Sequence, residues 1–154
     1  MKSDGGLRSL FRKYLPEVHW TTIESRHTES GIPDLNGCDA GVDFWIECKL
    51  TKSWYVKVSP FQEAWILRRV RNGGTCYVAV RRKSKIHKCD ELWLVHGHAV
   101  RQLRKGLRHL PEAAVATGGP FAGGPRHWRW PALRACFVQG RAAHGRGLAG
   151  GPLG

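Results

Sequence analysis

Two carboxylates and a lysine stand out in a strongly basic chain. The formal net charge is +13 at pH 7, yet six of the twelve acidic residues lie between Glu24 and Glu47. Asp34 and Glu47 occur in "GIPDLNGCDAGVDFWIECK", whose composition predicts strands that are partly buried. Removing a carboxylate from water is costly unless a cation meets it. This stretch therefore predicts a cation-binding site.

The expected strand register brings two of these acids face to face. In residues 42–50, "VDFWIECKL", apolar residues alternate with a second face that carries Asp43, Trp45, Glu47 and Lys49. Residues 39–42, "DAGV", predict a short hairpin connection, because Gly41 can adopt a positive φ. Counting back from this loop places Asp34 opposite Glu47, with Cβ atoms about 4.5 to 5.5 Å apart. Two carboxylates that close repel each other unless a cation lies between them.

Magnesium is the cation that such a pair of acids favours. Mg²⁺ prefers oxygen ligands in octahedral geometry, and it commonly combines one or two carboxylates with waters and a substrate phosphate. The ion would offset the repulsion between Asp34 and Glu47, bind a phosphoryl oxygen and lower the pKa of a bound water. The alternative is an ordinary cross-strand ion pair on a solvated strand face.

The elements that must position these residues follow from residue spacing. Residues 7–15, "LRSLFRKYL", have the apolar spacing of a short helix, and residues 18–25, "VHWTTIES", have the composition of a strand. Residues 75–80, "TCYVAV", are almost wholly apolar, as in a central strand covered on both faces. A helix between this strand and residues 42–50 implies a right-handed parallel crossover.

That intervening helix has a clear start. Ser59, Pro60 and Gln62 give an N-cap, a first-turn proline and a capping-box partner, so a helix should run from here to about Arg71. We expect its apolar side chains to face inward, namely Phe61, Ala64, Trp65 and either Leu67 or Val70.

The remaining segments carry weaker signals. Residues 91–95 predict a strand, residues 99–107 a helix with Val100, Leu103 and Leu107 inward, and residues 131–138 a short helix. We expect one domain over residues 1–139. Residues 140–154 are rich in glycine and lack acids, which predicts a disordered tail.

Composition narrows the setting in which the protein acts. Five cysteines without a CxxC pair favour reduced thiols in a cytoplasmic protein. No apolar run approaches the roughly 18 to 20 residues that a membrane span requires, so we expect a soluble chain with no membrane partner. A pI near 10.2 is typical of proteins that bind polyanions, most commonly nucleic acid.

The motifs "PD" at 33–34 and "ECK" at 47–49 lie in one expected hairpin, and a glutamine opens the next helix. This arrangement resembles the PD-(D/E)XK nuclease superfamily, in particular the phage and archaeal Holliday-junction-resolvase-like branch and its VRR-NUC relatives. The resemblance covers roughly residues 20–80. It implies an α/β fold with a restriction-endonuclease-like core, in which a central mixed sheet of αβββαβ order is flanked by helices.

The resemblance also implies an activity. Members are Mg²⁺-dependent endonucleases that hydrolyse DNA phosphodiester bonds, with Mn²⁺ as a substitute for Mg²⁺. The branch implies branched or structured DNA as substrate, a homodimer that cuts two strands symmetrically, and a phage-encoded protein acting in the host cytoplasm.

Site residues transfer one at a time from the resemblance. Asp34 and Glu47 would be carboxylate metal ligands, and the backbone carbonyl of Cys48 would complete the set. Lys49 would orient the attacking water or stabilise charge on the phosphate. Gln62 would support the nucleophile or Lys49, although a capping-box role explains it equally well. Glu24 looks like the upstream acid that holds a second metal or a metal-bound water, with Glu29 and Asp4 as alternatives.

A run of basic residues follows the expected site. Beside a phosphate-cutting centre, these residues favour contact with the DNA backbone: Arg68, Arg69, Arg71, Arg81, Arg82, Lys83 and Lys85. Two other functions remain open at this point. The chain could be a non-catalytic nucleic-acid-binding module on a nuclease-like scaffold, or a basic structural protein of a nucleoprotein particle in which the motifs are accidental.

Overall fold

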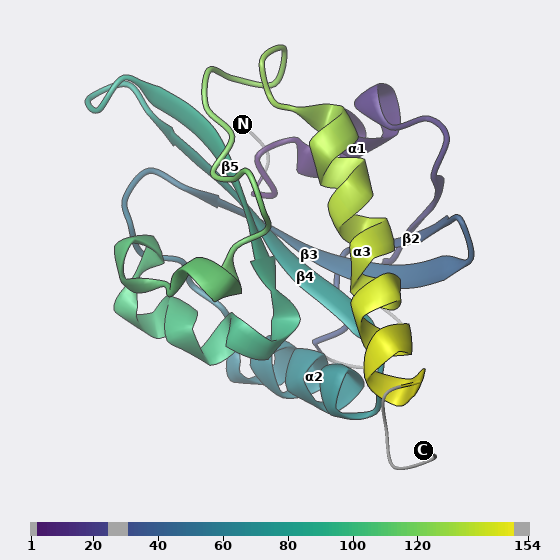
Figure 1. Cartoon of the computed structure of the whole chain (residues 1–154). Helices are drawn as coiled ribbons and strands as arrows, with labels where there is room; N and C mark the ends of the chain where they lie inside the picture. Colours follow the sequence, from purple (N-terminus) through teal and green to yellow (C-terminus); the bar gives the residue numbers. More distant parts are fainter. Residues whose placement is uncertain (1–2, 25–30, 150–154) are drawn as a thin grey trace.

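A five-stranded mixed sheet forms the centre of the protein (Figure 1). The structure is a computed structural model that describes residues 3–24 and 31–149, the last ten of these by their backbone alone. The strands lie side by side in chain order: β1 (His19–Thr22), β2 (Leu35–Asp39), β3 (Val42–Thr51), β4 (Thr75–Ser84) and β5 (Cys89–His96). Only the β3 and β4 pair is parallel, as the crossover predicts, and the other neighbours are antiparallel.

The helices flank this sheet and confirm the expected mixed α/β class. They are α1 (Leu7–Tyr14), α2 (Pro60–Arg71), the 3₁₀ segments η2 (Gly97–Lys105), η3 (Leu107–His109) and η4 (Glu112–Ala114), and α3 (Trp130–Ala149). From α1 to β4 the chain runs helix, three strands, helix, strand. Helices α1 and α3 pack on one face of the sheet, whereas α2 and η2 pack on the other.

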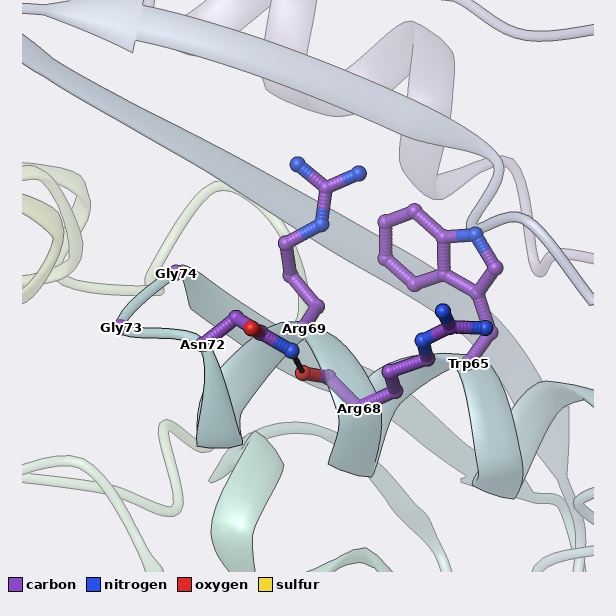
Figure 2. Close-up of a pocket in the computed structure, with 6 residues that line it drawn as sticks. All are labelled: Trp65, Arg68, Arg69, Asn72, Gly73 and Gly74. Atoms are coloured by element: carbon purple, nitrogen blue, oxygen red, sulfur yellow. Dashed lines mark hydrogen bonds between the residues drawn. The ribbon is translucent and has the colours of Figure 1, made fainter.

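Helix α2 has the predicted bounds, and Trp65, Leu67 and Val70 pack against the core as predicted, but its first turns bury other residues. Phe61 is 68% exposed and Ala64 is also exposed, so the prediction that both point inward is wrong. Ile66 and Glu63 are buried in their place. Burial of the Glu63 carboxylate is possible because Arg101 and Arg104 of η2 both form ion pairs with it. Figure 2 shows the C-terminal half of α2, where Arg68 and Arg69 extend beside the Trp65 indole.

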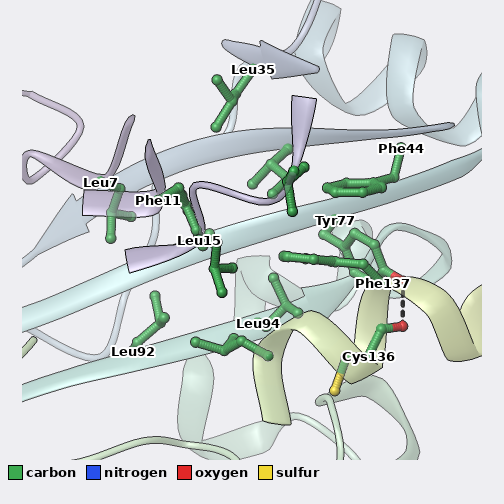
Figure 3. Close-up of a cluster of buried hydrophobic side chains, with 14 of the residues drawn as sticks. Leu7, Phe11, Leu15, Leu35, Phe44, Tyr77, Leu92, Leu94, Cys136 and Phe137 are labelled. Atoms are coloured by element: carbon green, nitrogen blue, oxygen red, sulfur yellow. Dashed lines mark hydrogen bonds between the residues drawn. The ribbon is translucent and has the colours of Figure 1, made fainter. Parts of the chain in front are cut away.

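The face under α1 and α3 holds the larger aromatic core (Figure 3). The rings of Phe44 and Phe137 stack with centroids 4.3 Å apart, and the buried Tyr77 hydroxyl donates to the Cys136 carbonyl oxygen at 3.1 Å. Cys48 belongs to this core, as the strand alternation predicts. The neighbouring residues Glu47 and Lys49 therefore project from the opposite face, toward α2.

The β2–β3 hairpin keeps the predicted register with a tighter turn than predicted. Ala40 and Gly41 both have positive φ, at 50° and 79°, and they form a two-residue connection. Asp39 and Val42 therefore pair with each other, so the expectation that they lie in a four-residue loop is wrong. Cys38 still pairs with Asp43, and every register position before it stays as predicted.

Two later segments also differ from the sequence expectation. The segment around residues 99–107 forms 3₁₀ helices in place of the expected regular helix, although Val100, Leu103 and Leu107 are buried as predicted. Helix α3 continues to Ala149, past the position where the sequence predicts the tail to begin. Alanine and arginine, which favour helices, allow a helix already nucleated by buried residues to propagate. Residues 150–154 lie outside the described residues.

Candidate active site

Asp34 lies immediately before β2 and is held from both sides. Leu35 pairs with Ile46, so continuing the register by one residue places Asp34 opposite Glu47, as predicted. The Asp34 carbonyl oxygen accepts from the Ile23 backbone N–H at 2.9 Å, and its carboxylate Oδ2 accepts from the Cys48 backbone N–H at 3.0 Å. These contacts fix the carboxylate against the middle of β3.

Glu47 is the most strongly perturbed acid of this cluster. Its side chain is only 3% exposed, and Oε1 accepts a hydrogen bond from Gln62 Nε2 at 3.1 Å. The other oxygen, Oε2, is buried without a hydrogen-bond partner among the described residues. Burial, followed by the negative charge of Asp34, raises the pKa of Glu47 to about 8, although Lys49 acts in the opposite direction. A cation beside this carboxylate would relieve both effects.

Lys49 and Gln62 complete the cluster that the sequence predicts. The Lys49 ammonium lies 3.6 Å from Glu47 Oε1 and donates to Gln62 Oε1 at 2.9 Å. Gln62 Oε1 also accepts from the Ser59 backbone N–H at 3.0 Å, while Ser59 Oγ accepts from the Gln62 backbone N–H at 3.1 Å. The capping box and the contacts to Glu47 and Lys49 therefore use the same glutamine side chain. The capping-box interpretation is confirmed, whereas a role for Gln62 in catalysis stays a prediction.

These two roles of Gln62 can be separated by mutation. We expect Ser59→Ala and Gln62→Ala each to destabilise the fold by about 1 kcal/mol, because each removes part of the helix cap. If the protein cleaves DNA as its motifs predict, only Gln62→Ala should also lower the cleavage rate, by about 10-fold or more, because it releases Lys49 and one donor to Glu47. Thermal unfolding and plasmid nicking of both variants check this. Equal loss of cleavage in the two variants would reduce Gln62 to a capping residue.

A glycine brings the Asp34 segment against α2. Gly31 has φ +87°, and a Cβ at this position would lie 2.2 Å from the Phe61 carbonyl oxygen. Contact this close is possible only without a side chain. The "GIPD" segment therefore packs directly on the first turn of α2, which also carries Gln62.

The expected third acid does not join this cluster. Glu24 is exposed, and the described ranges 3–24 and 31–149 contain no group of three or more His, Cys, Asp or Glu side chains suited to a metal ion. Asp4 is buried, but its carboxylate pairs with Arg8 at 2.9 Å and accepts from the Gly6 backbone N–H. Glu29 lies outside the described residues. Among the described residues, Asp34 and Glu47 are thus the acids of the candidate site.

The predicted basic surface divides into two classes. Arg68, Arg69, Arg71 and Lys85 are exposed, and Lys83 is half-buried. Arg81 and Arg82 are buried, where they pair with Asp90 at 2.7 Å and Glu91 at 3.0 Å. Their assignment to nucleic-acid contact is therefore wrong, because each guanidinium is already neutralised by an acid of the neighbouring strand β5.

No profile of a known protein family matches the chain, and no curated protein sequence matches it. Within the described part of the chain, no helix combines the length and apolar character needed to cross a membrane.

Proposed function

We propose that the protein is a metal-dependent endonuclease that hydrolyses DNA phosphodiester bonds, on a restriction-endonuclease-like core related to PD-(D/E)XK nucleases. The observation that supports the proposal is the convergence of Asp34, which immediately precedes β2, with Glu47 and Lys49 of β3 and Gln62 of α2. Direct contacts join Glu47, Lys49 and Gln62. The order of elements from α1 to β4 is compatible with such a core.

The residues present fit a magnesium ion. Mg²⁺ commonly takes one or two carboxylates from the protein and keeps several waters. Asp34 and Glu47 would hold the ion, with the Cys48 carbonyl as the third ligand, and the buried Oε2 of Glu47 has no hydrogen-bond partner among the described residues. Burial and then the negative charge of Asp34 raise the pKa of Glu47, and a bound cation would oppose both effects. When bound, Mg²⁺ would supply charge for a phosphoryl oxygen and lower the pKa of a water.

Lys49 would act on the substrate directly. Its ammonium lies on the same strand face as Glu47, and Gln62 holds it in place by accepting a hydrogen bond from it. From this position it would stabilise the negative charge that develops on the phosphate, or orient the attacking water. Gln62 would act as a positioning residue for both Lys49 and Glu47.

The second candidate function is a non-catalytic nucleic-acid-binding module. One observation favours it: the described residues bring no third acid to Asp34 and Glu47. Such a module would bind DNA in a salt-dependent manner and would leave the phosphodiester bond intact.

A cleavage panel on linear, flapped and four-way DNA distinguishes the two candidates. We expect cleavage with Mg²⁺ or Mn²⁺, none in EDTA, and the fastest reaction on a branched substrate. Binding of all three substrates without any cleavage in either metal would instead support the binding module.

A further inference from the structure

A pocket with basic and aromatic walls lies along the C-terminal half of α2. We call it the tryptophan–arginine pocket; its lining residues are Trp65, Arg68, Arg69, Asn72, Gly73 and Gly74, and its volume is about 680 Å³. Figure 2 shows the guanidinium groups of Arg68 and Arg69 beside the Trp65 indole. The size is within the range of sites that hold small organic ligands, about 300 to 1,000 Å³.

A second tryptophan supports this pocket from the sheet. Trp45 of β3 and Trp65 have ring centroids 5.3 Å apart, with their planes inclined at 61°. The Arg69 guanidinium carbon lies 4.5 Å from the Trp65 centroid and 5.4 Å from the Trp45 centroid. The arginine is thus held against two indole rings, which fixes its position without neutralising its charge.

The pocket is carried by α2, and the neighbouring Trp45 by β3, two of the elements that carry the candidate active site. Trp45 lies two residues before Glu47 on the same face of β3, a separation of about 7 Å along the strand. Along α2, Trp65 comes about one helical turn after Gln62, and Arg69 comes about two turns after Gln62. The elements that carry Glu47 and Gln62 therefore also carry the walls of the pocket.

The arginines of the pocket differ from most others in the protein. Arg8, Arg81, Arg82, Arg101, Arg104 and Arg134 each pair with an acid. Arg68 and Arg69 are exposed and form no ion pair within residues 3–24 and 31–139. Two such cations beside the half-buried Trp65 indole suit a ligand that combines a phosphate with a flat ring.

We propose that the tryptophan–arginine pocket binds an unpaired nucleotide of the DNA strand adjacent to the scissile phosphate. The base would stack on the Trp65 indole and the Arg69 guanidinium, and its phosphate would pair with Arg68. An unpaired nucleotide is required because base pairing and stacking in an intact duplex leave no base face open to an indole. This inference rests on the proposed nuclease function and names its substrate class: DNA with a single-stranded or frayed segment.

Binding measured in EDTA tests the pocket independently of cleavage. We expect Trp65→Ala to weaken binding of a fluorescent single-stranded oligonucleotide by about 5- to 150-fold, since one base–aromatic stack contributes about 1 to 3 kcal/mol. Affinity for a blunt duplex at the same salt concentration should change less than about 2-fold. Trp65→Phe, which keeps a stacking surface, should retain most of the single-strand affinity.

Trp54→Ala provides the matched control. Trp54 is also half-buried with an arginine over its ring, because the Arg82 guanidinium carbon lies 3.7 Å from its centroid, but it does not line the pocket. Its removal should leave single-strand affinity unchanged. The inference is overturned if Trp65→Ala affects neither DNA, affects both equally, or matches Trp54→Ala. None of these results depends on whether the protein cleaves DNA, so failure of the nuclease proposal would be recognised separately.

Discussion

Asp34→Asn should abolish metal-dependent cleavage of DNA while leaving the fold intact. The asparagine Oδ1 can still accept from the Cys48 backbone N–H, which Asp34 Oδ2 accepts at 3.0 Å, so the local backbone should be retained. The variant loses one of the two negative charges that would hold a divalent cation, and we expect a rate loss of at least about 100-fold. Nicking of a supercoiled plasmid in Mg²⁺ and in Mn²⁺ measures it.

Two further variants make this result specific. Lys49→Ala should also lose cleavage, because it removes the ammonium that lies 3.6 Å from Glu47, yet it should still bind DNA. Asp43→Asn is the matched control, since Asp43 is an exposed acid on the same face of β3 and accepts a hydrogen bond from Asn36. It should retain wild-type activity. Equal activity in wild type and Asp34→Asn would refute the catalytic role of Asp34.

Local signals in the sequence were sufficient to place the candidate site. Strand alternation assigned Glu47 and Lys49 to one face, and a hairpin count placed Asp34 opposite Glu47. The pattern of Ser59 and Gln62 predicted where α2 begins. This helix start places Gln62 in contact with Glu47 and Lys49. All of these depend on residues close in sequence or on neighbouring strands.

The homodimer and the cytoplasmic location stay predictions.

Features set by distant packing were missed. The burial of Glu63 on α2 could not be deduced locally, because its carboxylate becomes compatible with burial only through Arg101 and Arg104, about 40 residues later. Contact between Trp45 and Trp65 likewise depends on how α2 lies on β3. Burial of Arg82, in contrast, was within reach. Arg82 pairs directly with Glu91 in the β4–β5 hairpin, and this register could have been counted from the two strands.

Arg8 is a further residue near the site that the sequence analysis did not single out. Its hydrogen bond with Asp4 raises the pKa of the guanidinium, and the negative charge of Asp34 adds to this effect. Arg8 therefore lies close enough to Asp34 to interact electrostatically with its carboxylate, although the Arg8 side chain forms an ion pair with Asp4. Proximity of the first turn of α1 to Asp34 follows from packing of α1 on β3, which no local pattern specifies.

Glu47→Gln should stabilise the metal-free protein at high pH and abolish its response to metal. Folding raises the pKa of Glu47 from 4.5 to about 8, chiefly by burial. The folded state therefore binds this proton more tightly than the unfolded state, so stability is greatest below about pH 4.5 and falls as the pH rises through about 8. The loss is on the order of 5 kcal/mol. The glutamine variant should lack this fall, which urea unfolding between pH 5 and pH 9 in EDTA measures.

Glu63→Gln is the control with the opposite sign, because the buried Glu63 carboxylate already pairs with Arg101 and Arg104. Its neutralisation should destabilise the protein at pH 8. Adding Mg²⁺ at pH 8 should raise the unfolding temperature of wild type and of Glu63→Gln, but not of Glu47→Gln, since an ion that binds only the folded state stabilises it. Two results would contradict a cation site at Glu47. In the first, Glu47→Gln is less stable than wild type at pH 9; in the second, Mg²⁺ raises the unfolding temperature of Glu47→Gln as much as that of wild type. On the expected results, Glu47 would destabilise the metal-free fold, and a bound ion would offset this effect. Strongly perturbed pKa values of this kind are typical of functional sites.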